Sequence, residues 1–248
     1  MNTTTYKFLL CITVLFAFLT ALSPRASANS LILDLSPYQY GVGGEFNASS
    51  ATLNPTALGY ASSTMMNYHG HGMGFETFCL EYNEEFIPGG TYNYTISQAA
   101  IHGGTTTFDP ISLGTAWLYL HFAEGNLTGY DYTNAANRTA DAGLLQNAIW
   151  WLEQEHNLTY DSSNKFELAA FNRFGGEAGA RADNNGFYGV AVLNLYDLNG
   201  GLAQDQLCLV PDSGTTAVLL GVGLLGLFLF KRKAQTLAAR RKATIKLG

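Results

Sequence analysis

Basic residues are scarce in the long middle section of this chain. Between residues 29 and 210 only four of the 13 Lys and Arg residues occur, beside 18 Asp and Glu residues, which gives this section a formal charge of −14. Proteins that bind nucleic acid need clustered Lys and Arg side chains for the phosphates, so the composition argues against a nucleic-acid partner. A strongly acidic surface suits a soluble exported protein instead.

The sequence also lacks the motifs of several enzyme classes. It contains no phosphate-binding loop, no dinucleotide-binding glycine fingerprint and no visible Ser-His-Asp arrangement. His69 and His71 could offer two imidazoles to a metal ion, but no Cys or acidic residue stands beside them at zinc spacing. The sequence therefore predicts a protein that is not an enzyme and has neither a cofactor nor a metal site.

The N-terminus has the parts of a secretory signal peptide. Lys7 precedes an apolar stretch at residues 8–22, and Ala26-Ser27-Ala28 provides the small-residue cleavage pattern. We therefore expect residues 1–28 to direct the chain to the Sec export machinery and to be removed.

The C-terminus contains a second apolar stretch, residues 215–230, which ends at Lys231, Arg232 and Lys233. An apolar helix can cross a bilayer because its backbone polar groups are satisfied internally. Flanking cations stay on the cytoplasmic side of the membrane. The sequence therefore predicts a C-terminal transmembrane helix, a basic cytoplasmic tail at residues 234–248, and a domain outside the cell before the span.

The residues before this span complete a sorting signal. Residues 210–233 contain a short motif, an apolar span and a basic stop in the order of the PEP-CTERM signals of bacteria, and resemble the VPDSG-CTERM variant. The motif residues are Val210, Pro211, Asp212, Ser213 and Gly214. This resemblance implies an exosortase, a membrane-embedded cysteine transpeptidase, as a partner that processes an inner-membrane intermediate near Pro211. An ordinary C-terminal membrane anchor is the alternative interpretation.

Residues 29–209, between the two ends, are predicted to form one β-rich extracellular domain. Period-2 patterns indicate strands and 3.6-residue periodicity indicates helices. The expected strands cover residues 31–35, 75–82, 91–96, 187–196 and 206–209, and the expected helices cover residues 110–124, 139–156 and 165–174. Strands and helices do not alternate regularly, which predicts an α+β fold: an antiparallel β sandwich or barrel with two to three helices inserted in the middle.

Two local features refine this expectation. The strands on either side of the turn at Pro88 are expected to pair as a β-hairpin over residues 75–96. Asp109 is expected to cap the first helix, with Pro110 in its first turn.

Two segments of the domain contain candidate chemistry. The sequence FCLE at residues 78–81 lies on a predicted strand, and LQNAIW at residues 145–150 lies on a predicted helix. Together they resemble the thioester domains of bacterial surface adhesins. By this resemblance the Cys79 sulfur would attack the Gln146 amide to form a thioester, which an amine on another surface could later open. A thiol is an intrinsically good nucleophile, and a carboxamide can give its acyl group by losing ammonia.

Other interpretations of Cys79 stay open. Cys11 leaves with the signal peptide, so Cys79 and Cys208 remain in a compartment where a disulfide between them can persist. Cys79 can equally be a buried small apolar residue. Gln146 can be a polar residue on a helix whose other side packs against the core.

The sequence thus predicts an exported protein with a structural or adhesive role at the cell surface or in an extracellular matrix. Its partners there would be a polysaccharide or a surface amine. A covalent adhesin is one alternative. A secreted hydrolase that uses Glu81, Glu84 and Glu85 is another, because glycosidases need two carboxylates at a set separation.

Overall fold

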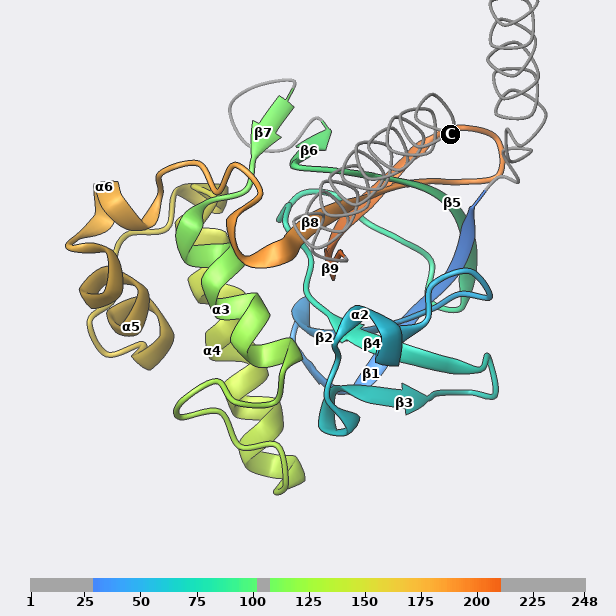
Figure 1. The fold of residues 1–248 in the computed structure, drawn as a ribbon, viewed down its shortest axis with the longest axis horizontal. Coiled ribbons are helices and arrows are strands. Elements are labelled where there is room, and N and C mark those ends of the chain that lie inside the picture. The colour runs from blue at the N-terminus through green and yellow to red at the C-terminus, as the bar shows by residue number, and fades with distance from the viewer. Residues whose placement is uncertain (1–28, 102–107, 211–248) are drawn as a thin grey trace, which may run out of the picture.

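The computed structural model describes residues 29–101 and 108–210, which form a seven-stranded antiparallel sheet and a small two-stranded sheet with helices packed beside them (Figure 1). The strands are β1 (Ser30–Tyr40), β2 (Gly43–Ser49), β3 (Met65–Asn67), β4 (Met73–Thr77), β5 (Gly90–Ser97), β6 (Ala99–Ile101), β7 (Phe108–Pro110), β8 (Val190–Tyr196) and β9 (Leu202–Leu209). The α-helices are α2 (Pro55–Leu58), α3 (Leu113–Ala123), α4 (Ala135–Leu152), α5 (Lys165–Phe174) and α6 (Glu177–Ala180), and the 3-10 helices are η1 (Ser62–Thr64), η2 (Glu155–Asn157) and η3 (Phe187–Gly189).

The large sheet has the strand order β3-β4-β2-β1-β5-β8-β9. Its edge strand β9 also pairs with the continuation of β4. The chain directly after β4 meets β9, because Leu80 N donates to Asp205 O over 3.1 Å and Cys79 forms an antiparallel bridge with Gln206. These bonds close the sheet into a barrel. The predicted antiparallel, β-rich fold with a few helices is therefore confirmed, and the barrel is the form that it takes.

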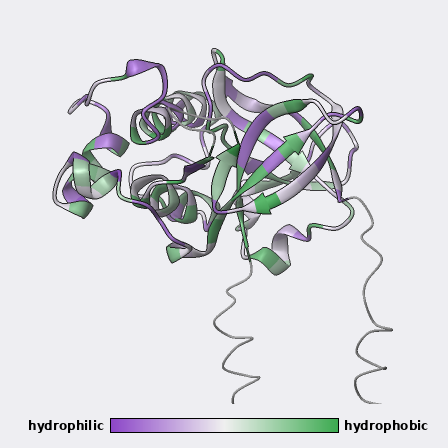
Figure 2. Ribbon diagram, turned by 90° about the horizontal axis from the view of Figure 1, so that it is seen from above, coloured by the Kyte–Doolittle hydropathy of each residue, from purple (hydrophilic) through white to green (hydrophobic). Residues whose placement is uncertain are grey.

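The helices α3, α4, α5 and α6 gather on one side of the barrel in both views (Figures 1 and 2). The helix α4 contacts β1 and β2, and it also packs against α3 and α5. The largest fully buried side chains come from both halves: Phe46, Phe75 and Phe78 from the barrel, and Tyr119, Phe122 and Trp151 from the helices. Helices and barrel thus share one hydrophobic core.

Polar side chains fix the starts of the helices. Ser112, Asn134 and Asn164 precede α3, α4 and α5, and the side-chain oxygen of each accepts a hydrogen bond from the first turn. The predicted helix at residues 165–174 is confirmed by α5. The predicted cap at Asp109 is wrong, because Asp109 lies in β7 and α3 begins only after Ser112.

The hairpin predicted for residues 75–96 is also wrong. β4 pairs with β2 and β3, whereas β5 pairs with β1 and β8. The chain after β4 crosses to β9 and then follows an irregular path to β5. The local pattern identified both strands, but the partner of each strand depends on contacts that are distant in the sequence.

Among the described residues, none of the helices has both the length and the apolar character that a membrane span requires. The predicted signal peptide, transmembrane helix and basic tail lie outside the described residues.

Candidate functional site

The two residues of the predicted thioester are in contact. Cys79 lies just after β4, and Gln146 lies in the second half of α4. The thiol of Cys79 donates to Gln146 Oε1 over 3.4 Å, and Gln146 Nε2 donates back to the backbone carbonyl of Cys79 over 2.8 Å. The structure therefore brings together a thiol and a carboxamide that are 67 residues apart in the sequence.

This pair is enclosed in the core. Cys79 is 0% exposed and Gln146 is 1% exposed. Burial, followed by the negative charge of Glu81, raises the pKa of the Cys79 thiol well above its ordinary value, while the indole of Trp150 acts in the opposite direction. The thiol is therefore protonated at neutral pH, in agreement with its role as hydrogen-bond donor to Gln146.

Gly43 provides the space that Gln146 occupies. A Cβ atom at residue 43 would stand 2.5 Å from Cγ of Gln146 and 2.8 Å from Cη2 of Trp150. Such distances are too short for carbon atoms that are not bonded, so the backbone of β2 can pass over Gln146 only because glycine has no side chain. Gly43 could not be recognised from the sequence, since nothing in the local pattern shows which helix residue lies against it.

Aromatic side chains lie beside the pair. Tyr82 packs edge-on against Trp150 with ring centroids 4.9 Å apart, and it stacks on His156 at 3.9 Å. Tyr82 also lines a surface cavity of about 310 Å³ together with Glu84 and Glu85. Tyr82, three residues after Cys79, thus contacts Trp150 and also lines an acidic cavity at the surface.

Glu81 is a buried residue that takes part in the hydrogen bonding of the fold. Its side chain is buried, and Oε2 accepts a hydrogen bond from Asp205 N over 3.2 Å, next to the bonds that close the barrel. Burial, followed by the charge of Asp205, raises the pKa of Glu81 well above its usual range. Of the three acids considered for a hydrolase, Glu84 and Glu85 line the cavity beside Tyr82.

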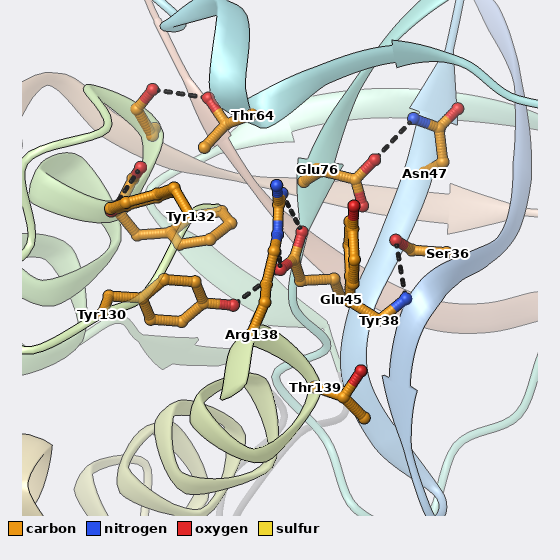
Figure 3. Close-up of polar contacts among 12 residues, drawn as sticks. Ser36, Tyr38, Glu45, Asn47, Thr64, Glu76, Tyr130, Tyr132, Arg138 and Thr139 are labelled. Atoms are coloured by element: carbon orange, nitrogen blue, oxygen red, sulfur yellow. Dashed lines mark hydrogen bonds and ion pairs between the residues drawn. The ribbon is translucent and has the colours of Figure 1, made fainter. Parts of the chain in front are cut away.

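A buried ion pair fixes α4 against β2 (Figure 3). Arg138 Nε and Nη2 donate to the two carboxylate oxygens of Glu45, each over 2.7 Å, and the hydroxyl of Tyr130 donates to the same carboxylate over 2.6 Å. Arg138 lies about two helical turns before Gln146, on the same face of α4. The ion pair therefore helps to set the position of Gln146 relative to β2. In the sequence, Arg138 stands out only because basic residues are scarce in this part of the chain.

The predicted disulfide is absent from the structure. Cys79 and Cys208 are both free and buried, and the sulfur of Cys79 is directed to Gln146. Cys208 lies on β9 opposite Ala191, and burial raises the pKa of its thiol to about 12. The structure thus gives two protonated thiols, and the disulfide stays a prediction without structural support.

The comparisons with known proteins concern the end of the chain. Val210 is the last described residue, and its N–H donates to Gly189 O over 2.9 Å; the rest of the sorting motif and the basic stop at residues 231–233 lie outside the described residues. No curated protein and no solved structure matches the chain. The resemblance of residues 75–152 to thioester domains is not supported by these comparisons. The VPDSG-CTERM motif is found at residues 210–234, so the chain carries the C-terminal sorting signal of exported, exosortase-processed proteins.

Proposed function

We propose that this exported protein is released by an exosortase and acts at the cell surface or in the extracellular matrix as a covalent adhesin. The VPDSG-CTERM match supports the export and the sorting. The adhesive chemistry rests on one observation, the 3.4 Å contact between Cys79 Sγ and Gln146 Oε1.

In the proposed first step the Cys79 sulfur adds to the side-chain carbonyl carbon of Gln146. The S–C bond forms, the C–N bond breaks, and the thiol hydrogen departs with the nitrogen as ammonia. The 2.8 Å bond from Gln146 Nε2 to the Cys79 carbonyl orients the amide so that Oε1 faces the sulfur. Because both side chains are buried, water has little access to the product.

In the proposed second step a primary amine on a partner surface attacks the thioester carbonyl. The N–C bond forms, the C–S bond breaks, and the amine proton ends on Cys79, whose raised pKa favours the thiol. Glu84 and Glu85 at the cavity beside Tyr82 favour the approach of a cationic amine. The product is an amide that links the partner to residue 146.

The intact mass of the full chain, purified without reductant, tests this proposal. A thioester lowers the mass by one ammonia relative to the calculated value, and methylamine then adds to the protein. Cys79→Ala and Gln146→Ala should each have their full calculated masses and should not react with methylamine. Cys208→Ala is the matched control, because it removes the other buried thiol and should keep the deficit.

Two outcomes would contradict the proposal. The full calculated mass would mean that Cys79 and Gln146 are joined by hydrogen bonds only. A mass that is low by two hydrogens, and only when both Cys79 and Cys208 are present, would mean a disulfide.

A non-covalent structural component of the matrix is the second candidate function. The observation in its favour is the complete burial of Cys79, which raises the pKa of its thiol and disfavours the thiolate, the reactive form of cysteine. A hydrolase would instead require turnover of a polysaccharide that is lost in Glu81→Gln.

A further inference from the structure

Three side chains that can ligate a metal meet at one edge of the barrel. Asp34 lies on β1, while His69 and His71 lie in the turn between β3 and β4. One donor atom of each residue lies within 4.8 Å of the donor atoms of the other two. This cluster could not be recognised from the sequence, because Asp34 precedes His69 by 35 residues.

The carboxylate of Asp34 is buried beside two histidines, without a Lys or Arg partner among the described residues. Its side chain is 7% exposed, and Oδ1 accepts a hydrogen bond from Leu35 N over 2.8 Å. Its other oxygen, Oδ2, lies 2.6 Å from His69 Nδ1 and 3.8 Å from His71 Nε2, and among the described residues no Lys or Arg forms an ion pair with it. A buried carboxylate is costly unless a cation compensates its charge. A divalent ion between the imidazoles would supply that charge.

The turn holds both imidazoles near Asp34. His71 N donates to Tyr68 O over 3.1 Å, and the ring of Tyr68 lies on that of His69 with centroids 3.9 Å apart. His69 has a φ of 50°, a conformation that is uncommon for a residue other than glycine. The side chains of His69 and His71 are therefore positioned by their own turn before any ligand binds.

The spacing of the donor atoms fits a small transition-metal ion. Zinc bonds of about 2.0–2.2 Å in a tetrahedral site place neighbouring donor atoms roughly 3.3 Å apart. The observed distances of 2.6 Å and 3.8 Å from Asp34 Oδ2 lie on either side of this value, so small rotations of the two rings would complete the site. The side chains of His69 and His71 are 58% and 31% exposed, which leaves a further coordination position open to water.

We propose that Asp34, His69 and His71 form a binding site for a divalent first-row transition-metal ion, with Zn²⁺ as the expected occupant. Two imidazoles and one carboxylate are ligands that suit zinc. The bound ion would tie the β3–β4 turn to β1 and would offer its open position to an external oxygen ligand. This site shares no residue with the Cys79–Gln146 pair.

Isothermal titration calorimetry of Zn²⁺ into the full chain in detergent, after removal of metal by a chelator, tests the site. We expect one tight site in the wild type, weakened at least tenfold in His71→Ala and in His69→Ala. His121→Ala is the matched control, since it removes an imidazole on α3 outside the cluster, and it should bind Zn²⁺ like the wild type. Zn²⁺ should also raise the Tm of the wild type and of His121→Ala but not that of His71→Ala.

The absence of Zn²⁺ binding by the wild type would overturn the proposal. So would equal affinities of the wild type and the two cluster variants. The turn is exposed, and circular dichroism of the metal-free variants verifies that they are folded. A weakened affinity in Asp34→Asn, which keeps a hydrogen-bonding side chain beside His69, would show that the carboxylate itself binds the ion.

Discussion

At the scale of single residues, the Cys79–Gln146 contact depends on Gly43, which has no Cβ atom. The strand β2 and the helix α4 approach so closely at this point that any side chain at residue 43 would meet Gln146 and Trp150. Thiol, carboxamide and glycine therefore form one geometric unit, although they lie in three different parts of the chain.

Gly43→Ala should displace the Gln146 side chain. Overpacking of a well-packed core typically costs about 1–3 kcal/mol, and we expect a loss of this size in the free energy of unfolding. Urea denaturation measures the loss. If the thioester forms, the fraction of molecules whose mass is low by one ammonia should also fall in this variant, because the carboxamide can no longer remain beside the sulfur.

The same substitution in a Gln146→Ala background provides the control. There the contact with Cγ of residue 146 is gone, and only the contact with Trp150 remains. Gly43→Ala should therefore cost less in this background than in the wild type. An equal cost in both backgrounds would mean that the closeness of Gly43 and Gln146 has no energetic consequence.

At the scale of elements, the position of α4 against β2 is set by polar contacts as well as by the core. Arg138 is 4% exposed, and its guanidinium pairs with Glu45 while lying 4.0 Å from the ring centroid of Tyr38 on β1 (Figure 3). One charged side chain of α4 thus contacts both strands of the first hairpin. The same helix presents Gln146 two turns later.

Arg138→Met should strongly destabilise the protein. It would leave the carboxylate of Glu45 buried without its cation, and breaking a buried ion pair in this way costs about 3–5 kcal/mol. Urea denaturation measures the change. The double variant Glu45→Gln/Arg138→Met should recover part of the loss, because no unpaired charge remains.

Arg173→Met is the matched control, since Arg173 is exposed on α5. We expect a change of less than about 0.5 kcal/mol for this surface position. Equal effects of Arg138→Met and Arg173→Met would contradict a role of the buried pair in positioning α4.

These elements also show how far the sequence could predict the structure. The helix at Lys165–Phe174 and parts of β1, β4, β5, β8 and β9 follow from local periodicity, whereas β2, β3, β6 and β7 lie outside the expected strands. The resemblance of two short motifs predicted that Cys79 and Gln146 meet. The false hairpin arose because periodicity shows which residues are buried but not which strand lies alongside. The pairing of β4 with β2 and the crossing of the chain to β9 depend on the whole barrel.

The polar contacts were even less accessible to prediction. Glu45 and Arg138 are 93 residues apart, and Asp34 and His69 are 35 residues apart. Each partner alone resembles an ordinary surface residue in the sequence. Only the closed barrel, with α4 across one side and the β3–β4 turn at its edge, makes these residues neighbours.

At the scale of the whole molecule, the domain encloses several carboxyl groups. Burial raises the pKa values of Glu76, Glu81, Glu153 and Asp205 above their ordinary values. Glu153 is an instructive case: its Oε1 accepts hydrogen bonds from both the N–H and the hydroxyl of Ser112, yet burial still raises its pKa to about 7. The folded protein therefore holds protons that the unfolded chain would release.

The free energy of unfolding should accordingly fall as the pH rises from 5 to 8. A raised pKa means that the folded state binds more protons than the unfolded state between the two pKa values, so stability decreases with pH in that window. For Glu153 the window runs from 4.5 to about 7, which corresponds to about 3 kcal/mol. Urea denaturation at both pH values measures the change, and Glu153→Gln should reduce it while Glu177→Gln, at a half-buried position on α6, should not. Equal or greater stability at pH 8 would show that these buried carboxyl groups ionise without cost to the fold.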